Sequence, residues 1–443
     1  MGKVSTSITC KSTENQVNYP LRIWWDKGFN PQEDEALIQL VDDWEQKNPQ
    51  PIQLSFYTSD ELSQKVQRAI KAEDPPDIIM NFKSERSLNS RLAWEGKLVD
   101  VSDVITPAAQ NYEQAILDGV KYYNNQTKER SYYAVPINQA TVHIYYWRDM
   151  LSNLGYTDAD IPQDWDNFWN FWKKVHEQLQ AKNLDVDGIG FPMSIEAADT
   201  HLTFEQILEA YDVQVLKPQG GINVDAPQVR QGIIKCLDWY SQFYRQSYVP
   251  KEAIKWLNPD NNRSFLNRSI VMTPNYTLSI PGALRQEPDT YLNKLGMVEF
   301  PNKPSGEPMR SLVTVEQAII FADSKNQKAA RSFLAYMIQP EVMAEYLKNA
   351  GGRNAPVVKQ VWNEPFWHNQ QDPHILTATK TLTQGKTRLF YIAQNPAYSL
   401  VLKENVWGRA LQDIVLNNST PEQAAEQAIA RIKAIFSEWK SEK

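Results

Sequence analysis

The sequence predicts an α/β fold built from two lobes, and three observations support this. Residues 21–57 read as a strand, a helix and a second strand, which is a β-α-β unit. The chain has 443 residues, which is too long for one ordinary hydrophobic core. A proline interrupts the junction between two expected strands at residues 136–139, where the chain is expected to cross between lobes. Hydrophobic residues make up 42% and charged residues 22%, as in globular proteins.

The β-α-β unit is the stretch around which the other elements are arranged. Residues 21–24 (LRIW) have the apolar character of a buried parallel strand, which stops at Asp26-Lys27-Gly28. Pro31 suits a first helical turn, and the acids at 33–35 suit the positive end of a helix dipole. The second strand alternates apolar residues over 52–56. Because open α/β sheets bind ligands at the carboxyl ends of their strands, the end of the first strand is a candidate site.

The remaining elements follow from hydrophobic period and from turn residues. Helices are expected near residues 60–71, 84–94, 112–120, 148–154, 325–338, 340–350, 404–415 and 420–439. Strands are expected near residues 78–82, 131–136, 139–146, 188–194, 270–274, 295–300 and 318–322. Residues 162–270 are mainly helical, and the Pro/Gly-rich turn 301–307 is expected to return the chain to the first lobe.

Aromatic residues are numerous, with fourteen Trp and twenty Tyr. Most are expected to fill the core. The aromatic face over residues 165–172 has helical spacing, which favours a core role over a site role. A minority are expected to line a site whose ligand offers flat, weakly polar faces.

Charge and cysteine content exclude several classes of function. The net charge is −7 and no basic block is present, so nucleic acid is not expected as a partner. No stretch reaches the length of a membrane span. Of the two cysteines, Cys236 lies in an apolar helical pattern and is expected to be a buried free thiol, whereas Cys10 lies in a polar lead.

The polar lead, residues 1–17, is expected to be disordered and to follow a removed signal, because it lacks a hydrophobic signal core. Cys10 is a candidate for the lipid-anchored first residue of a mature lipoprotein. The preceding Ser7-Ile8-Thr9 matches the small-residue signature of such a site poorly, so a membrane tether through Cys10 stays open.

Catalytic motifs are missing from the sequence. It contains no phosphate loop, dinucleotide glycine fingerprint, GxSxG or HExxH. The five histidines are scattered. Residues 183–188 resemble the front of a calcium loop, but Ser194 stands where a bidentate Glu is needed. We therefore expect no enzyme, no metal and no cofactor, while a pair of glycosidase carboxylates cannot be located from sequence.

Several ordered segments together resemble the extracellular solute-binding proteins of ABC importers, the sugar-binding family that includes the maltose and trehalose/maltose binding proteins. The matching segments are WWD (24–26), DPPDII (74–79), GKLVDVS (96–102), YAVPINQATVHIYYWRDMLSNLGY (133–156), PxxWDxF (162–168), FLNRSIVMTPNY (265–276), KNQKAARSFLAYMIQPE (325–341), GGRNAPV (351–357) and the W-x3-L-x-D-I tail with its STPEQAAEQA helix. The resemblance spans almost the whole chain. One departure is Gln139-Ala140, where the family often has an acidic residue.

The resemblance implies a two-lobed periplasmic-binding-protein fold, type II-like, with hinge strands between the lobes and a ligand cleft between them. By analogy, lobe one would be 18–137 plus 307–340 and lobe two 138–306 plus 341–443. It also implies a monomer, periplasmic or extracellular, that closes around its ligand and delivers it to the permease subunits of an ABC transporter.

Candidate ligand-binding residues come from strand ends and from the matched motifs. Carboxylates and amides are expected to bind sugar hydroxyls, and Trp25, Phe82 and Tyr276 to stack on ring faces, while Trp24 is expected to pack inward. The expected set is Trp25, Asp26, Asn81, Phe82, Asn138, Gln139, Ser194, Glu196, Asn275, Tyr276, Glu316 and Arg353.

The ligand that these residues favour is a small carbohydrate, from a mono- to a trisaccharide or an osmolyte such as glucosylglycerol, sucrose or trehalose. Two alternatives remain at the sequence level. One is a different small solute, such as a polyol phosphate, a polyamine or a peptide, because Arg353 and Lys27 leave a phosphate site open. The other is an enzyme that cleaves glycosides.

Overall fold

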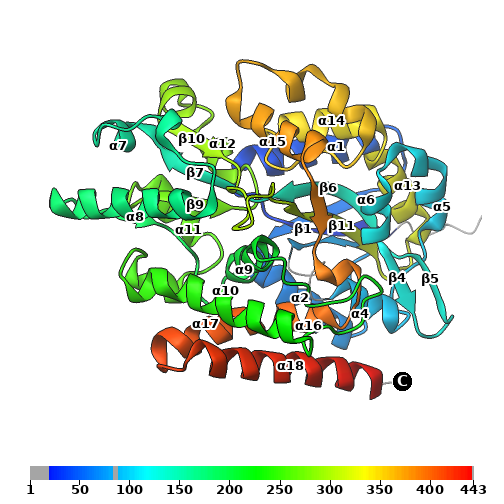
Figure 1. The fold of residues 1–443 in the computed structure, drawn as a ribbon. Coiled ribbons are helices and arrows are strands. Elements are labelled where there is room, and N and C mark those ends of the chain that lie inside the picture. The colour runs from blue at the N-terminus through cyan, green and yellow to red at the C-terminus, as the bar shows by residue number, and fades with distance from the viewer. Residues whose placement is uncertain (1–18, 83–87, 442–443) are drawn as a thin grey trace, which may run out of the picture.

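The α/β class is confirmed by the computed structural model, which describes residues 19–82 and 88–441. Two sheets lie side by side with helices around them (Figure 1). The larger sheet has the order β12-β11-β3-β1-β2, and β6 also pairs with β11. Its strands are β1 (Leu21–Asp26), β2 (Ile52–Tyr57), β3 (Ile78–Met80), β6 (Val135–Thr141), β11 (Ser311–Ile320) and β12 (Thr387–Leu389).

The opening β-α-β unit is confirmed. β1 and β2 are parallel, with Leu21 opposite Ile52, and α1 (Pro31–Glu45) connects them. A capping box starts α1, because the Asn30 backbone N–H donates to Glu33 Oε1 at 2.9 Å. The helix buries one apolar stripe, made of Ala36, Leu37, Leu40, Val41 and Trp44. The helix thereby packs on β2, α13 (Gln327–Met337) and α14 (Pro340–Asn349).

The smaller sheet belongs to the second lobe and has the order β10-β7-β9-β8. Its strands are β7 (His143–Trp147), β8 (Asp187–Ile189), β9 (Ile270–Asn275) and β10 (Leu295–Val298). Around it lie α7 (Arg148–Ser152), α8 (Trp165–Ala181), α9 (Ala198–Ala210), α10 (Pro227–Arg245), α11 (Asp260–Leu266) and α12 (Ser279–Leu284). The aromatic face of α8 is buried, as the sequence predicts: Trp165, Phe168, Trp169, Phe171 and Trp172 are each less than 9% exposed.

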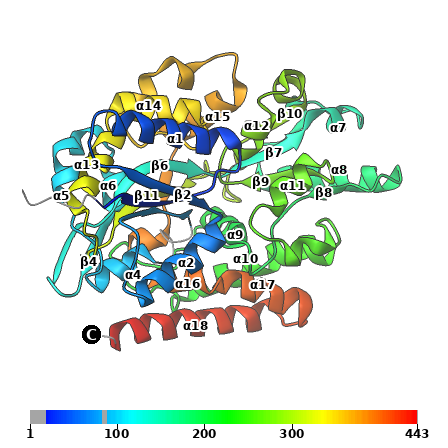
Figure 2. The same ribbon diagram turned by 180° about the vertical axis from the view of Figure 1, so that it is seen from behind.

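Helices of the first lobe include α2 (Ser59–Lys71), α4 (Asn89–Trp94), α5 (Ser102–Ile105), α6 (Gln114–Gly119), α13 (Gln327–Met337) and α14 (Pro340–Asn349), and β4 (Lys121–Asn124) pairs with β5 (Glu129–Tyr132). The C-terminal part adds α15 (Pro373–Gln384), α16 (Tyr398–Lys403), α17 (Val406–Leu416) and α18 (Pro421–Ser441). In both views α18 runs beneath α10 and α17 (Figures 1 and 2). Its Trp439 contacts Trp94 of α4, with ring centroids 5.6 Å apart.

The crossing between the sheets differs in detail from the sequence prediction. We expected a strand to end at Pro136, but β6 runs through it into Thr141. Proline is tolerated there because the register of β6 with β11 shifts between Glu316 and Gln317, next to the position opposite Pro136. β11 is also longer than the expected 318–322. It returns the chain alongside β6, so two long antiparallel strands form the connection.

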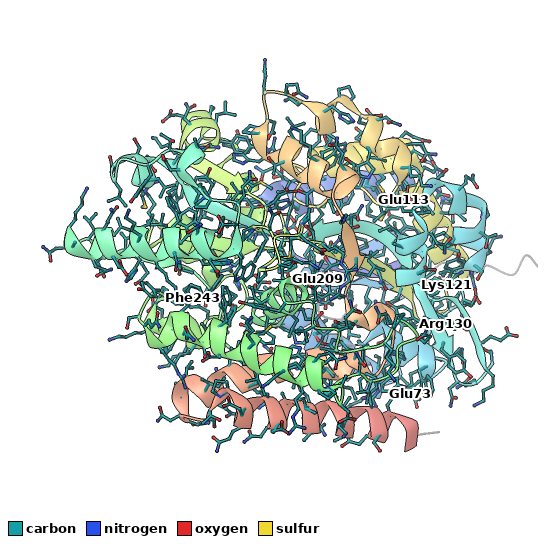
Figure 3. All side chains as sticks on the ribbon, in the orientation of Figure 1. Glu73, Glu113, Lys121, Arg130, Glu209 and Phe243 are labelled. Carbon is teal, nitrogen blue, oxygen red and sulfur yellow. The ribbon has the colours of Figure 1, made fainter. Side chains whose placement is uncertain are left out.

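A charged cluster fastens α9 to this return. Glu209 of α9 is buried and accepts hydrogen bonds from Arg310 Nε at 2.5 Å and Arg388 Nε at 2.8 Å. Figure 3 labels Glu209 near the centre of the molecule, where α9 approaches the crossing strands. Gln206 extends the attachment, because its Oε1 accepts from the Leu312 backbone N–H. The second lobe is therefore bound directly to the start of β11.

The lobe boundaries 18–137 plus 307–340 and 138–306 plus 341–443 stay a prediction. Two segments assigned to lobe two contact lobe one instead. α14 packs on α1 and α13, and β12 pairs in parallel with β11 in the larger sheet. These contacts favour placing residues 341–349 and Thr387–Leu389 in lobe one, where the prediction already has Pro340.

Candidate functional site

A cavity of about 580 Å³ lies where the two lobes face each other. From lobe one it is lined by Lys27, Gly28 and Phe29 after β1, by Thr58, Ser59 and Asp60 at the start of α2, and by Phe82 after β3. From lobe two it is lined by Asp199, Leu257, Asn258, Pro259, Asn262, Arg263, Asn275, Tyr276, Thr277 and Ser279, while Arg353 joins from the segment after α14. The volume is within the range of small-molecule sites.

The lobe-one wall is organised by Asp26 at the end of β1. Its carboxylate is only 4% exposed and accepts hydrogen bonds from Ser59 Oγ at 2.9 Å, Asn81 Nδ2 at 2.8 Å and the Phe82 backbone N–H at 2.6 Å. These donors come from α2 and from the end of β3. Asp26 thus holds together the elements that carry Ser59 and Phe82 into the cavity, and it does not itself line the cavity.

Asp26 is expected to make stability depend on pH. Burial raises the pKa of its carboxyl to about 7, although the hydrogen bonds from Phe82, Ser59 and Asn81 and the charge of Arg353 lower it. Between the ordinary carboxyl pKa and 7 the folded state binds more protons than the unfolded state, so this group's contribution is largest in acid and is lost as pH rises towards 7. Asp26→Asn should remove this dependence on pH. In the wild type it lowers the free energy of unfolding by on the order of a few kcal/mol between pH 4 and pH 8. Urea unfolding of both proteins from pH 4 to 8 measures it, and parallel curves would contradict this assignment.

Arg353 links the walls. Its Nη1 donates to Glu33 Oε2 at 2.6 Å, its Nε lies 3.5 Å from Thr277 Oγ1, and its guanidinium lies 5.2 Å from the centre of the Phe82 ring. Burial alone would lower the pKa of Arg353, but the carboxylates of Glu33, Glu316 and Asp26 together outweigh it and raise the pKa above its ordinary value. The charge is therefore already balanced inside the protein.

The lobe-two wall follows β9. Asn275 and Tyr276 line the cavity, as the sequence predicts for the end of a strand. The Tyr276 hydroxyl donates to the Leu202 carbonyl oxygen at 2.6 Å, which leaves its ring against the cavity. Asn275 Nδ2 donates to the Thr277 carbonyl oxygen and to Ser279 Oγ, which ties the turn after β9 to the start of α12. Phe82 and Arg353 are the other expected residues in the lining.

Some expected residues lie elsewhere. Trp25 is 2% exposed and belongs to the core, while Trp24, expected to pack inward, is half-buried between Tyr57 and Lys65. Of the two tryptophans, Trp24 is therefore the more exposed, which is the reverse of our expectation. Asn81 is buried behind the cavity with Asp26.

Three other expected residues belong to the crossing. Asn138 and Glu316 are at most 1% exposed, and Gln139 exchanges backbone hydrogen bonds with Ala355 at 2.8 and 2.9 Å. Asn354 Nδ2 donates to Glu316 Oε2 at 3.1 Å. These residues position the segment that carries Arg353 and are outside the cavity lining.

Ser194 and Glu196 are separated from the main cavity. Ser194 is buried, and its Oγ accepts from the Glu196 backbone N–H at 3.0 Å. Glu196 lines a second recess of about 200 Å³, between α2 and the loop before α9. Asn405 holds that loop, because its Nδ2 donates to the carbonyl oxygen of Ile195 at 2.9 Å.

Several lining residues were not anticipated. Phe29, Thr58, Ser59 and Asp60 follow the ends of β1 and β2, so the strand-end rule used for Phe82 would have found them. Asn262 lies on α11 within a run of polar residues, and the sequence gives no signal that distinguishes it from its neighbours. Within residues 19–82 and 88–441, no three acidic, His or Cys side chains gather as a metal ion requires, and no helix is long and apolar enough to cross a membrane.

Comparison with known proteins identifies this architecture. The sequence model of the bacterial extracellular solute-binding protein family matches residues 39–377. The chain belongs to this family. The resemblance noted from sequence is therefore confirmed, and the interlobe cavity of this solute-binding protein lies between the two sheets that the family fold supplies.

Individual relatives are distant. The chain is 21% identical to a multiple sugar-binding protein of Streptococcus mutans over 395 residues, covering 80% of this chain and 84% of the relative. Among solved structures it resembles a solute-binding protein of Thermotoga lettingae bound with α-D-tagatose, at 19% identity and a TM-score of 0.78 over 94% of this chain and 99% of that one. It also resembles maltose-bound MalE3 of T. maritima, at 18% identity and a TM-score of 0.75 over 94% and 99%. At these identities the structures confirm the fold.

Proposed function

We propose that this chain is the substrate-binding component of a carbohydrate ABC importer. It captures a small sugar or glucoside, from a mono- to a trisaccharide or an osmolyte such as glucosylglycerol, sucrose or trehalose, by closure of its two lobes, and releases it chemically unchanged to a membrane permease. The observation that carries this proposal is the composition of the interlobe cavity, where hydroxyls, amides and carboxylates alternate with the rings of Phe29, Phe82 and Tyr276.

The charges around the cavity favour a neutral ligand. Arg353 is paired with Glu33 at 2.6 Å, and Arg263 with Asp260 at 2.9 Å. Asp60 and Asp199 add carboxylates to the lining. A phosphate would meet these carboxylates and an Arg353 that is already paired in a buried site, which disfavours the polyol phosphate alternative. Lys27 also lines the cavity, so the polyol phosphate stays the alternative that the titration below tests. Sugar hydroxyls suit the same groups, and sugar ring faces suit the aromatic side chains.

Closure is supported by the contacts that already join the lobes. Asn30 Nδ2 of lobe one lies 3.5 Å from the Ser279 carbonyl oxygen of lobe two, and Arg353 lies between Glu33 and Thr277. A ligand that touches both walls stabilises the closed form by its differential contacts. The location, periplasmic or extracellular, follows from the family. A lipid tether at Cys10 lies outside the described residues and stays a proposal, as does a monomeric state.

Titration calorimetry tests the proposal. Tagatose, maltose, trehalose, sucrose and glucosylglycerol are titrated into the purified protein, and at least one is expected to bind with a Kd on the order of micromolar, about −8 kcal/mol. Chromatography of the mixture should recover the sugar intact. Turnover of any panel sugar would favour a glycoside-cleaving enzyme instead, and heat from spermidine or glycerol 3-phosphate alone would favour a different solute.

A further inference from the structure

One contact between the lobes depends on the absence of a side chain at Gly282. Asn30 is the N-cap residue of α1 in lobe one, and it is only 8% exposed. Gly282 lies on α12 in lobe two, and a Cβ atom added there would come within 2.5 Å of Asn30 Nδ2. That distance is well below van der Waals contact. The lobes therefore approach each other this closely because residue 282 is a glycine.

Arg353 joins the lobes beside this contact. It follows Gly351 and Gly352, whose φ angles of +74° and +67° form a turn in a conformation that glycine adopts readily. The Arg353 carbonyl oxygen accepts a hydrogen bond from the Leu278 backbone N–H of lobe two at 2.8 Å. Its guanidinium donates to Glu33 of α1, in lobe one, at 2.6 Å. Arg353 is thus bound to lobe two by its main chain and to lobe one by its side chain.

Both contacts lie at the edge of the cavity. The described lining includes the residue before Asn30 and the first residue of α12, but neither Asn30 nor Gly282 itself. Glu33 connects the two contacts, because its Oε1 accepts from the Asn30 backbone N–H at 2.9 Å while its Oε2 accepts from Arg353. Opening of the lobes on this side would separate Asn30 from Gly282 and strain the Arg353–Glu33 pair at the same time.

We propose that Asn30 and Gly282 are positioning residues that set the ligand affinity without touching the ligand, because their contact stabilises the closed arrangement of the lobes. The effect on affinity rests on the proposed function, whereas the effect on the arrangement of the lobes does not. A ligand that requires the closed form binds more weakly in proportion to how rarely that form is populated. A side chain at residue 282 would push α12 away from α1, so the closed form would become rarer.

Scattering and calorimetry of substituted proteins test this inference. Gly282→Leu should have a larger radius of gyration than the wild type when no sugar is present. It should also bind the panel sugar that the wild type binds about tenfold more weakly, and Gly282→Ala should change both quantities in the same direction by less. Alanine ordinarily stabilises a helix relative to glycine. Weaker binding by Gly282→Ala without a lower Tm would therefore separate an effect on closure from a loss of folding.

Gly221→Leu is the matched control for added bulk. A Cβ atom at residue 221 would meet no atom closer than Lys217 Cδ, 4.0 Å away, apart from those of its chain neighbours. This variant should have the scattering profile and the sugar affinity of the wild type.

A second substitution at residue 30 provides a rescue. Asn30→Ser removes the amide group, and serine is also a favoured N-cap residue. Asn30 Cγ, whose position a serine hydroxyl would take, is 3.6 Å from the Cβ added in Gly282→Ala, which is an ordinary contact distance. The combination of Gly282→Ala with Asn30→Ser should therefore bind the sugar more tightly than Gly282→Ala alone.

The outcomes separate the two proposals. A folded Gly282→Leu with wild-type scattering, wild-type affinity or tighter binding would overturn the inference and leave sugar binding intact. If Gly282→Leu does not fold, Gly282→Ala is judged by the same criteria, and equal affinities of Gly282→Ala and the rescue variant would also overturn the inference. If no panel sugar binds the wild type, the proposed function fails. Scattering without sugar then still decides whether Asn30 and Gly282 hold the lobes together.

Discussion

Replacing Arg353 by methionine is expected to lower the free energy of unfolding by about 3–5 kcal/mol, the usual effect of removing one partner from a buried ion pair. The side chains of Arg353 and Glu33 are 15% and 12% exposed, so the carboxylate left behind has little access to water. Denaturant unfolding at neutral pH measures the change. A loss below about 1 kcal/mol would mean that the pair behaves as a surface salt bridge.

The matched control is the double variant Glu33→Gln with Arg353→Met. Glutamine keeps an oxygen that can accept from the Asn30 backbone N–H, so the cap of α1 is preserved. It carries no charge, and the double variant should therefore be more stable than Arg353→Met alone. If the two variants are equally unstable, the loss arises from the contacts of Arg353 with Phe82 and Thr277 rather than from an uncompensated charge.

Replacing Trp172 by alanine is expected to cost about 3–5 kcal/mol, the range for a large buried aromatic side chain. Trp172 is 0% exposed and contacts Phe171, Tyr146 and Phe168, with ring centroids 5.1, 5.7 and 6.1 Å away. The cavity left behind would remove packing contacts between α8 and the smaller sheet, such as the contact with Tyr146 of β7. Thermal and denaturant unfolding both measure this loss.

Two further substitutions test the packing interpretation of Trp172. Trp172→Phe should cost less, because the indole N–H has no hydrogen-bond partner among the described residues and only volume is lost. Ile38→Ala on α1, where the side chain is 45% exposed, should change stability by no more than about 0.5 kcal/mol. An effect of Trp172→Ala as small as that of Ile38→Ala would contradict a core role for the aromatic face.

The sequence predicts those features that depend on a repeated pattern. Period and turn residues located the β-α-β unit, and the aromatic spacing of residues 165–172 correctly indicated a buried face. The strand-end rule placed Phe82, Asn275 and Tyr276 in the cavity lining. Trp25 lies outside that lining and is 2% exposed, because segments distant in the sequence cover it in the core.

The remaining errors share a physical cause. Pro136 was interpreted as a strand end, since a sequence does not show that the partner strand shifts register beside it. Ligand binding by Asp26 stays a prediction, and the sequence did not show that three protein donors contact its oxygens. Asn262 was not anticipated in the lining, because its place there depends on how α11 lies beside α12, whose Ser279 accepts a hydrogen bond from it. Side-chain partners that come from distant segments are visible only in three dimensions.

Small-angle scattering tests the central claim most directly, namely that two lobes close on a small polyhydroxy molecule held between them. Profiles are recorded for the protein alone and saturated with whichever sugar of the calorimetry panel binds. The account predicts a smaller radius of gyration with that sugar and an unchanged profile with a non-binding sugar of the same size. Superimposable profiles at saturation would contradict closure.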